Sequence, residues 1–141
     1  MNDRFFLDTN IFLYSFDRNL AKKAQRATQL IRQALTTRKG IISYQVAQEF
    51  LNVALRRFET PLSVSEAEQY LATVLSPLLV VHSSLSLYQA ALQIREKILV
   101  SWYDALILEA ALDAGCAVLY SEDFQHGQRI GAMRIVNPFL Q

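Results

Sequence analysis

The sequence predicts an α/β fold with a mostly parallel central sheet of four or five strands. Short apolar runs of strand length recur along the chain. Segments in which apolar residues return at helical spacing separate these runs. Such alternation is typical of β-α-β units, whose strands lie parallel in one sheet.

Composition indicates one globular domain spanning residues 1–141, because the chain has no repeats and no linker, and 52% of its residues are apolar. Cys116 is the single cysteine, so no internal disulfide is possible, and we expect a cytoplasmic protein. Asp3 and Asp8 stand where a signal peptide needs a basic and then an apolar region, so we expect no signal peptide. The longest uncharged stretch, 69–94, contains Pro77 and has LLVV as its continuous apolar run, so we expect no membrane association through a spanning helix.

The first half of the chain contains two predicted strands and two predicted helices. Residues 4–7 (RFFL) form a buried strand that ends at Asp8, and Thr9 and Asn10 turn the chain. A helix follows over 20–36, because alanine, isoleucine and leucine recur there at helical spacing, and Gly40 ends it. The next elements are a buried strand over 40–43 (GIIS) and a helix over 44–58 that is stopped by Pro61.

The second half continues the alternation. Ser63 or Ser65 caps the next helix. Ser101 starts a later helix and Gly115 ends it. The expected elements are, in order, a helix over 65–75, a strand over 77–82, helices over 84–100 and 101–115, and strands over 116–123 and 133–138.

Acidic residues stand where predicted strands end and the following helices begin. They are Asp8, Glu49, Asp104 and Asp123, with Glu122 beside the last. In a parallel sheet these positions share one edge, and ligands bind at that edge. We therefore expect the four acids to converge, while alternation along the strand end directs Glu122 elsewhere.

Each acid also has a local explanation. Asp8 and Asn10 can form an Asx-turn, and Asp104 can form a capping box with Ser101. Glu49 can be an exposed helix residue, and Asp123 can cap a turn. Local roles such as capping or solvation would not by themselves place all four acids at one edge of the sheet. Their shared edge therefore favours a common site.

Four close carboxylates require a cation, because like charges resist ionisation together. Mg²⁺ and Mn²⁺ prefer carboxylate oxygens, and the chain has no Cys/His cluster that would favour zinc. The substrate of such a metal is typically a phosphate ester, whose oxygens bridge to the ion.

The motifs FLDTN (6–10), QEF (48–50), YDALILEAAL (103–112) and YSED (120–123) resemble the four acidic motifs of PIN-domain nucleases. More narrowly, the chain resembles the single-domain VapC-type ribonuclease toxins from residue 5 to about residue 139. The resemblance implies a three-layer, flavodoxin-like α/β/α sandwich. It also implies Mg²⁺- or Mn²⁺-dependent hydrolysis of RNA.

By motif position, Asp8 and Asp104 match the principal metal-binding acids of the family, and Glu49 and Asp123 match the other two. Ser121 matches a supporting Ser/Thr position. We expect Thr9, Asn10 and Ser121 to orient the ligands or bound waters. The resemblance further implies a homodimer and a cognate antitoxin, for which residues 50–75 are the place to look.

Seven basic and no acidic residues lie between Arg18 and Lys39. This pattern is either a solvated helix face or an electrostatic surface for a polyanion. Our candidates for RNA contact are Arg18, Lys22, Lys23 and Arg26. For Trp102 and Tyr103, beside Asp104, we expect core packing rather than stacking on a base.

Two other functions stay open from the sequence. One is a non-catalytic module that binds RNA or a partner, which needs the fold and the basic face but not the four acids. The other is a phosphatase with Asp8 as nucleophile after the first strand. Phosphatases of this kind have a second acid two residues after the nucleophile, where this chain has Asn10.

Overall fold

The central sheet runs through the middle of the molecule in the computed structural model, which describes residues 2–140. Its strand order is β3-β2-β1-β4-β6-β5. β5 pairs antiparallel with β6, and all other neighbours are parallel. The strands are β1 (Phe5–Leu7), β2 (Gly40–Ser43), β3 (Leu79–Val81), β4 (Val118–Tyr120), β5 (Arg129–Ile130) and β6 (Met133–Val136). The mostly parallel sheet is confirmed, with one short edge strand more than predicted.

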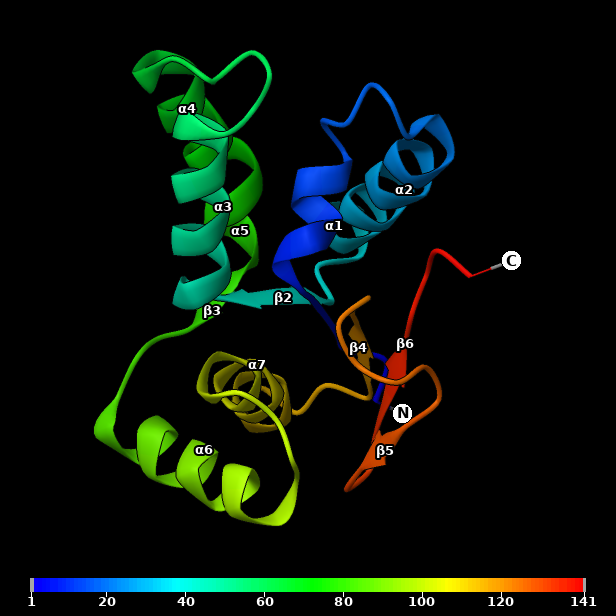
Figure 1. Cartoon of the computed structure of the whole chain (residues 1–141), viewed down its shortest axis with the longest axis vertical. Helices are drawn as coiled ribbons and strands as arrows, with labels where there is room; N and C mark the ends of the chain where they lie inside the picture. Colours follow the sequence, from blue (N-terminus) through cyan, green and yellow to red (C-terminus); the bar gives the residue numbers. More distant parts are fainter. Residues whose placement is uncertain (1, 141) are drawn as a thin grey trace.

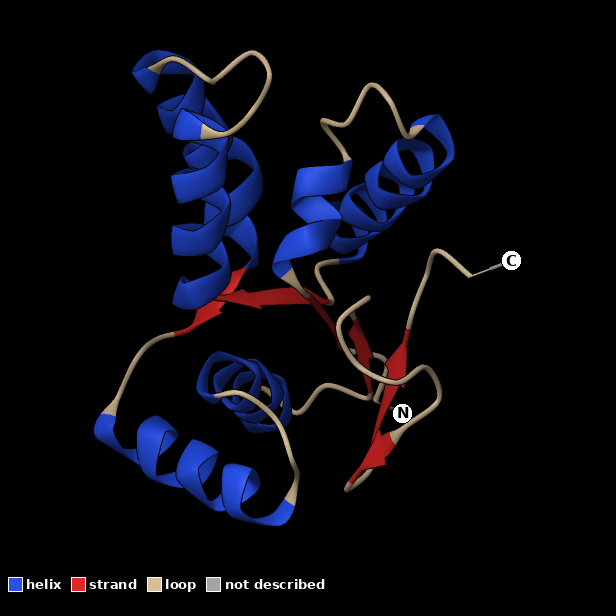
Figure 2. Cartoon of the chain, viewed as in Figure 1, coloured by secondary structure: helices blue, strands red, loops and turns tan. Residues whose placement is uncertain are grey.

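Helices cover both faces of this sheet, so the fold has three layers (Figure 1). The longest helix is α2, and α7 lies against the sheet on the opposite face, with α6 outside it (Figure 2). One face carries α1 (Thr9–Tyr14), α2 (Ala21–Thr37), α3 (Tyr44–Arg56), α4 (Val64–Tyr70), the π-helical turn η1 (Leu71–Leu75) and α5 (Ser76–Leu78), and the other carries α6 (Leu85–Lys97) and α7 (Trp102–Asp113). The predicted three-layer α/β/α fold is confirmed.

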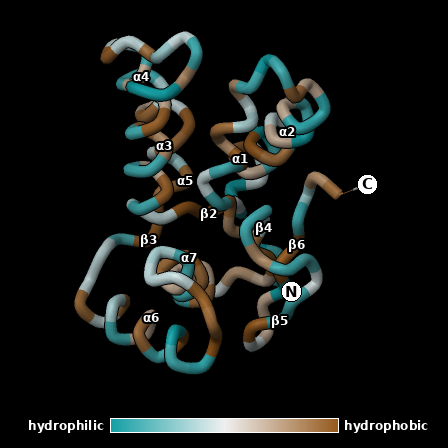
Figure 3. Tube along the Cα trace, viewed as in Figure 1, coloured by the Kyte–Doolittle hydropathy of each residue, from teal (hydrophilic) through white to brown (hydrophobic). Residues whose placement is uncertain are grey.

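The core is packed around β1 and α7. All three residues of β1 are buried, because this strand lies between β2 and β4 and has helices on both faces. Hydrophobic residues follow one another along much of α7 (Figure 3), which fits a helix enclosed between the sheet and α6. Its buried residues are Ala105, Leu106, Ile107, Leu108, Ala110 and Ala111. Within residues 2–140, no helix combines the length and apolarity needed to cross a membrane.

The turn expected after Asp8 is instead the start of helix α1. Asp8 is the N-cap residue, and its side chain accepts a hydrogen bond from the backbone N–H of Thr9. The helix escaped prediction because it has only six residues and is too short for a helical period to be recognised. Burial of Thr9, Ile11 and Phe12 against the rest of the fold stabilises it.

The prediction that Gly40 ends the preceding helix is wrong. Arg38 adopts the left-handed conformation at the end of α2, with φ of 61°. Gly40 instead begins β2 where the strand passes close to α2, and a Cβ atom at Gly40 would lie 2.1 Å from the Cβ of Ala34. The glycine therefore permits a close helix–strand approach.

The helix predicted over 65–75 extends at both ends, and the strand predicted over 77–82 is shorter. Helical backbone continues through η1 and α5 to Leu78, so Pro77 lies in the last helical turn rather than in a strand. Proline has no N–H to donate, and a π-helical turn directly before it accommodates that missing bond. Of the predicted caps, Ser63 forms a capping box with Glu66.

Candidate active site

Asp8 lies at the carboxyl end of the central strand and is almost completely enclosed. Its side chain is 4% exposed. One carboxylate oxygen accepts the backbone N–H of Thr9 at 2.7 Å, and the other accepts the hydroxyl of Ser121, at the end of β4, also at 2.7 Å. These two bonds hold the Asp8 side chain in one orientation.

The pKa of Asp8 is raised by its surroundings. Burial raises its pKa from the ordinary value of 3.8 to about 6, although the hydrogen bonds from Ser121 and Thr9 oppose the rise. The negative charges of Asp123 and Glu49 raise it further. Asp8 is therefore close enough to two other carboxylates for their charges to act on it.

Glu49 reaches this edge from the second turn of α3. Its Oε2 accepts the hydroxyl of Thr9 at 3.2 Å, and its Oε1 accepts the side-chain amide of Gln45 at 2.7 Å. The Gln45 amide also donates to the carbonyl of Tyr103, 3.2 Å away at the start of α7. Gln45 was not predicted from the sequence. Its position four residues before Glu49 on a helix is the signal that indicates such a contact.

Asp123 follows β4 and is held from both sides. Its backbone N–H donates to the Ser121 hydroxyl at 3.1 Å, and the side-chain amide of Asn10 donates to its two carboxylate oxygens at 3.2 and 3.4 Å. Partial burial raises the pKa of Asp123, and the charge of Asp104 is the next cause. The structure thus places Asn10 and Ser121 against the predicted acids.

Asp104 lies in the first turn of α7, where its backbone N–H donates to the Ser101 side chain at 3.1 Å. The reciprocal half of the predicted capping box is missing, and across residues 2–140 no hydrogen bond engages the Asp104 carboxylate. Asp104 and Asp123 line one hollow of about 720 Å³, together with Arg95, Leu99, Gln125 and Gln128 among others. The Asp104 carboxylate is therefore available to a ligand in this hollow.

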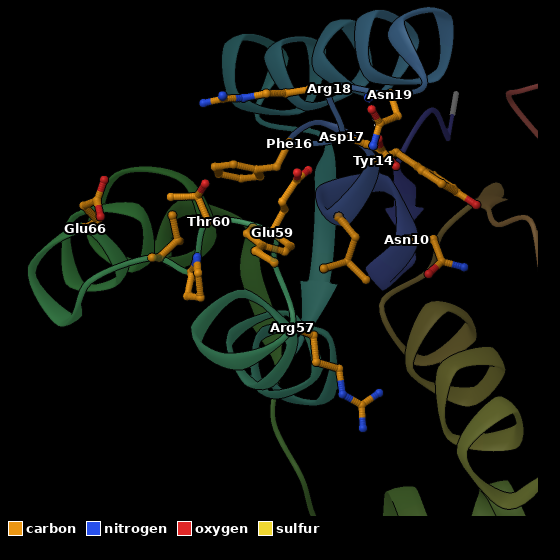
Figure 4. Close-up of a pocket in the computed structure, with 14 residues that line it drawn as sticks. Asn10, Tyr14, Phe16, Asp17, Arg18, Asn19, Arg57, Glu59, Thr60 and Glu66 are labelled. Atoms are coloured by element: carbon orange, nitrogen blue, oxygen red, sulfur yellow. Dashed lines mark hydrogen bonds between the residues drawn. The ribbon is translucent and has the colours of Figure 1, made fainter.

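A second hollow of about 790 Å³ lies on the other side of Asn10, between α1 and the loop after α3 (Figure 4). Phe16 and Glu59 line it, while the side chains of Arg18 and Arg57 extend away from its centre. Asn10 lines this hollow and also bonds to Asp123 of the first one. Asn10 therefore links the lining of the second hollow to Asp123.

The four acids fit a divalent cation in their donor chemistry. They offer only carboxylate oxygens, they act on one another electrostatically, and none forms an ion pair within residues 2–140. Within the same residues, no three acidic, histidine or cysteine side chains are arranged as a complete chelating site. Mg²⁺ is commonly held by one or two carboxylates, with waters and phosphate oxygens completing its coordination, so a three-residue cage is not required.

The basic residues predicted to contact RNA lie apart from this cluster. Arg18 and Lys22 are exposed. Lys23 pairs with Glu122 at 2.5 Å, and Arg26 donates to the carbonyl of Pro138 at 3.4 Å. Glu122 bonds to Lys23 and Tyr14 rather than to the four acids, although its charge also raises the pKa of Asp123.

Tyr103 is 65% exposed beside Asp104, so the expectation that it packs in the core is wrong. Trp102 is partly buried against Ala91, Ala105 and Leu106, and its ring lies 5.9 Å from that of Tyr88.

Solved structures with a similar fold include proteins of toxin–antitoxin systems. A toxin–antitoxin complex from Klebsiella pneumoniae matches with a TM-score of 0.68 at 20% identity, covering 95% of this chain and 97% of the other. Mycobacterium tuberculosis VapC20, described as a toxin that cleaves the sarcin–ricin loop, matches with a TM-score of 0.57 at 20% identity, covering 84% and 89%. VapBC2 from Rickettsia felis, bound to a DNA fragment from its promoter, matches with a TM-score of 0.60 at 17% identity, covering 93% and 96%.

Among curated protein sequences, the comparison finds no match. The sequence model of the PIN domain matches residues 5–129, which include all four predicted acids. This match covers most of the chain and confirms the resemblance predicted from the four motifs. The chain belongs to the PIN domain family.

Proposed function

We propose that this protein is a metal-dependent ribonuclease that hydrolyses RNA phosphodiester bonds, and that it is the toxin of a toxin–antitoxin pair. The observation that carries the proposal is the gathering of Asp8, Glu49, Asp104 and Asp123 at the carboxyl edge of the sheet, with no basic side chain paired to any of them in residues 2–140. An uncompensated group of carboxylates is suited to a cation and, through it, to a phosphate.

Asp8, Glu49, Asp104 and Asp123 would together hold the metal, as one or two cations and partly through bound waters; we propose that the metal is Mg²⁺ or Mn²⁺. When bound, it would supply a Lewis acid that activates water and neutralises charge on the phosphate. Asp8 is restrained by Thr9 and Ser121. Asp104 faces the first hollow without another partner in the described chain, which makes it the acid best placed to adjust to an incoming ligand.

Neighbouring polar side chains would keep the other two acids in position. Thr9 and Gln45 each donate to one oxygen of Glu49, so each oxygen keeps acceptor capacity for a ligand. Asn10 donates to both oxygens of Asp123. Supporting hydrogen bonds of this kind reduce the reorganisation needed when a ligand binds.

The substrate and partner rest on the family and on the fold neighbours. The M. tuberculosis neighbour is described as a toxin that cleaves the sarcin–ricin loop, the K. pneumoniae neighbour is a toxin–antitoxin complex, and the R. felis neighbour is VapBC2 bound to promoter DNA. We propose RNA as the substrate, passing over the acids at the hollow that Asp104 and Asp123 line, with Arg18 and Lys22 contacting its backbone. We further propose a homodimer and a cognate antitoxin, with exposed Leu55, Val64 and Leu71 among the interacting residues.

The direct test compares RNA cleavage by the wild type and by Asp8→Asn, with Mg²⁺ or Mn²⁺ and with a chelator. We expect the variant to remain folded and to lose activity by more than about a hundredfold, because the metal's charge stabilisation is worth several kcal/mol. A folded Asp8→Asn protein that cleaves RNA at the wild-type rate would refute the proposal. Absence of cleavage together with absence of Mn²⁺ binding by the wild type would favour a non-catalytic binding module.

The phosphatase alternative requires Asp8 to attack a phosphoryl group. Both oxygens of Asp8 accept hydrogen bonds, and the side chain is almost completely enclosed. This enclosure would hinder a cation as well as a phosphoryl group, so it does not separate the two functions, and the residue at position 10 is the observation that does. Asn10, where that mechanism wants a second acid, is engaged with Asp123.

A further inference from the structure

A group of side chains on the outer side of the β4 end binds Glu122, the residue directly before Asp123. We call Tyr14, Lys23, Glu122 and Phe139 the Lys23 cluster. The Lys23 ammonium donates to Glu122 Oε2 at 2.5 Å, and the Tyr14 hydroxyl donates to Glu122 Oε1. The same ammonium lies 4.4 Å from the ring centre of Tyr14 and 5.4 Å from that of Phe139.

The Lys23 cluster joins four segments that are far apart in the sequence. Tyr14 ends α1, Lys23 lies in the first turn of α2, Glu122 follows β4 and Phe139 belongs to the C-terminal segment. The rings of Tyr14 and Phe139 also pack edge to face at 5.0 Å. The cluster therefore fixes the outer side of the β4 end relative to both helices.

The inner side of the same short loop is fixed by Ser121. Its hydroxyl donates to Asp8 and accepts the backbone N–H of Asp123. Glu122 stands between these two residues, and its peptide bonds to them are planar. Restraining Ser121 on one side and Glu122 on the other therefore narrows the range of directions in which the Asp123 side chain can leave the backbone.

Two simpler interpretations of Lys23 explain less of the geometry. An exposed ion pair contributes little on average. This one is only 32% and 25% exposed at its two side chains, and its carboxylate has a second donor, Tyr14. An RNA contact requires an available ammonium, whereas Lys23 is paired with a carboxylate and lies over two rings.

We propose that Lys23 and Tyr14 are positioning residues for the metal site, which hold Glu122 outward so that Asp123 faces the other acids. The inference rests on the proposed metal-dependent function. It assigns Lys23 to the support of the metal site instead of to RNA contact. Loss of the Lys23 charge would release the Glu122 side chain. The backbone at Asp123 would then no longer be restrained in its present orientation.

The test compares Lys23→Met with Lys22→Met in the full-length protein. Both changes remove one positive charge from the first turn of α2, but Lys22 is exposed and forms no ion pair within residues 2–140. Mn²⁺ affinity is measured by calorimetry and by the electron paramagnetic resonance signal of the free ion. Cleavage assays give kcat and KM for RNA, and circular dichroism checks the fold.

We expect Lys23→Met to weaken Mn²⁺ binding roughly tenfold, the lower end of the range for outer partners of metal ligands. We also expect a lower kcat with little change in the KM for RNA. Lys22→Met should keep the Mn²⁺ affinity of the wild type. Lys23→Arg should restore much of the loss, and Lys23→Met should cause no further loss of affinity in an Asp123→Asn background.

Equal Mn²⁺ affinities of Lys23→Met and Lys22→Met would overturn the positioning role. So would a rise in KM for RNA with unchanged kcat, which is the result expected of an electrostatic contact. If Lys23→Met does not fold, Tyr14→Phe removes only one hydroxyl and must still weaken Mn²⁺ binding. A wild type that binds no Mn²⁺ would refute the proposed function and this inference together, whereas binding without the lysine difference refutes the inference alone.

Discussion

Replacing Asp8 by asparagine is expected to make the protein more stable near neutral pH, although the same change abolishes the proposed activity. The charged side chain is buried beside two other acids. Asparagine has nearly the same shape, carries no charge and can still accept the N–H of Thr9 through its carbonyl oxygen. The substitution therefore removes an electrostatic cost without opening a cavity.

The magnitude follows from the pKa of Asp8. The pKa of Asp8 rises from its ordinary value of 3.8 to about 6 in the folded protein. At about 1.4 kcal/mol per pKa unit, the ionised Asp8 side chain lowers the free energy of unfolding by about 3 kcal/mol. Because the folded pKa is raised, the cost of ionised Asp8 is fully present above about pH 6 and absent below the unfolded value of 3.8. The wild type should gain this stability as the pH falls through that interval, and Asp8→Asn should not.

The assay is thermal unfolding of both proteins in a chelator, at pH 7.5 and at pH 4. With roughly 3 °C per kcal/mol for a chain of this size, Asp8→Asn should unfold up to about 9 °C higher at pH 7.5. The difference should shrink towards zero at pH 4. Saturating Mn²⁺ should raise the melting temperature of the wild type and reduce the difference.

Asp113→Asn, at an exposed aspartate at the end of α7, is the matched control and should show no comparable pH-dependent gain. A lower melting temperature of Asp8→Asn at pH 7.5 would refute the reasoning. An equal gain at both pH values would also refute it, because the electrostatic cost is confined to the ionised carboxylate.

Three further predictions follow from single contacts. Ser121→Ala should lower the melting temperature and the free energy of unfolding, the latter by about 1–3 kcal/mol, because buried Asp8 loses a hydrogen-bond donor. It should also reduce RNA cleavage at least tenfold, the lower end of the effect of losing a residue that supports a metal ligand. A fully active variant would contradict this. Gly40→Ala should cost about 1–3 kcal/mol in urea unfolding, since its new Cβ would lie 2.1 Å from that of Ala34, and Ala34→Gly should partly restore stability. Tyr103→Ala should raise the KM for RNA while Tyr103→Phe leaves it near the wild-type value, if the exposed ring stacks on a base; equal KM values would exclude stacking.

The strands next to the acids were predictable because each is short and mostly apolar, and β1 and β2 are buried throughout. β1, β2 and β4 all lie within the predicted ranges. The start of α7 was also predictable, since Ser101 caps it as expected, whereas helix α1 after β1 was not predicted. The expectation that Asp8, Glu49 and Asp123 converge rests on a general property of parallel sheets, in which the carboxyl ends of strands share one edge. Asp104 lies on α7, which follows a helix, so this rule does not cover it.

Other features depend on contacts that no local pattern contains. The run of basic residues in α2 is visible in the sequence, but the pairing of Lys23 with Glu122 joins positions 99 residues apart. The same holds for Gly40, whose role depends on how closely β2 passes α2. A glycine near a helix end has two explanations in sequence, and only the tertiary packing separates them.

The bond between Ser121 and Asp8 also has a consequence for biosynthesis. It joins residues 113 positions apart, so the ribosome makes one partner near the start of translation and the other near its end. A nascent or truncated chain that stops before β4 lacks both Ser121 and Asp123 and cannot complete the acidic cluster. If the protein is a nuclease, the cell that makes it is therefore not exposed to its activity until synthesis of each molecule is almost finished.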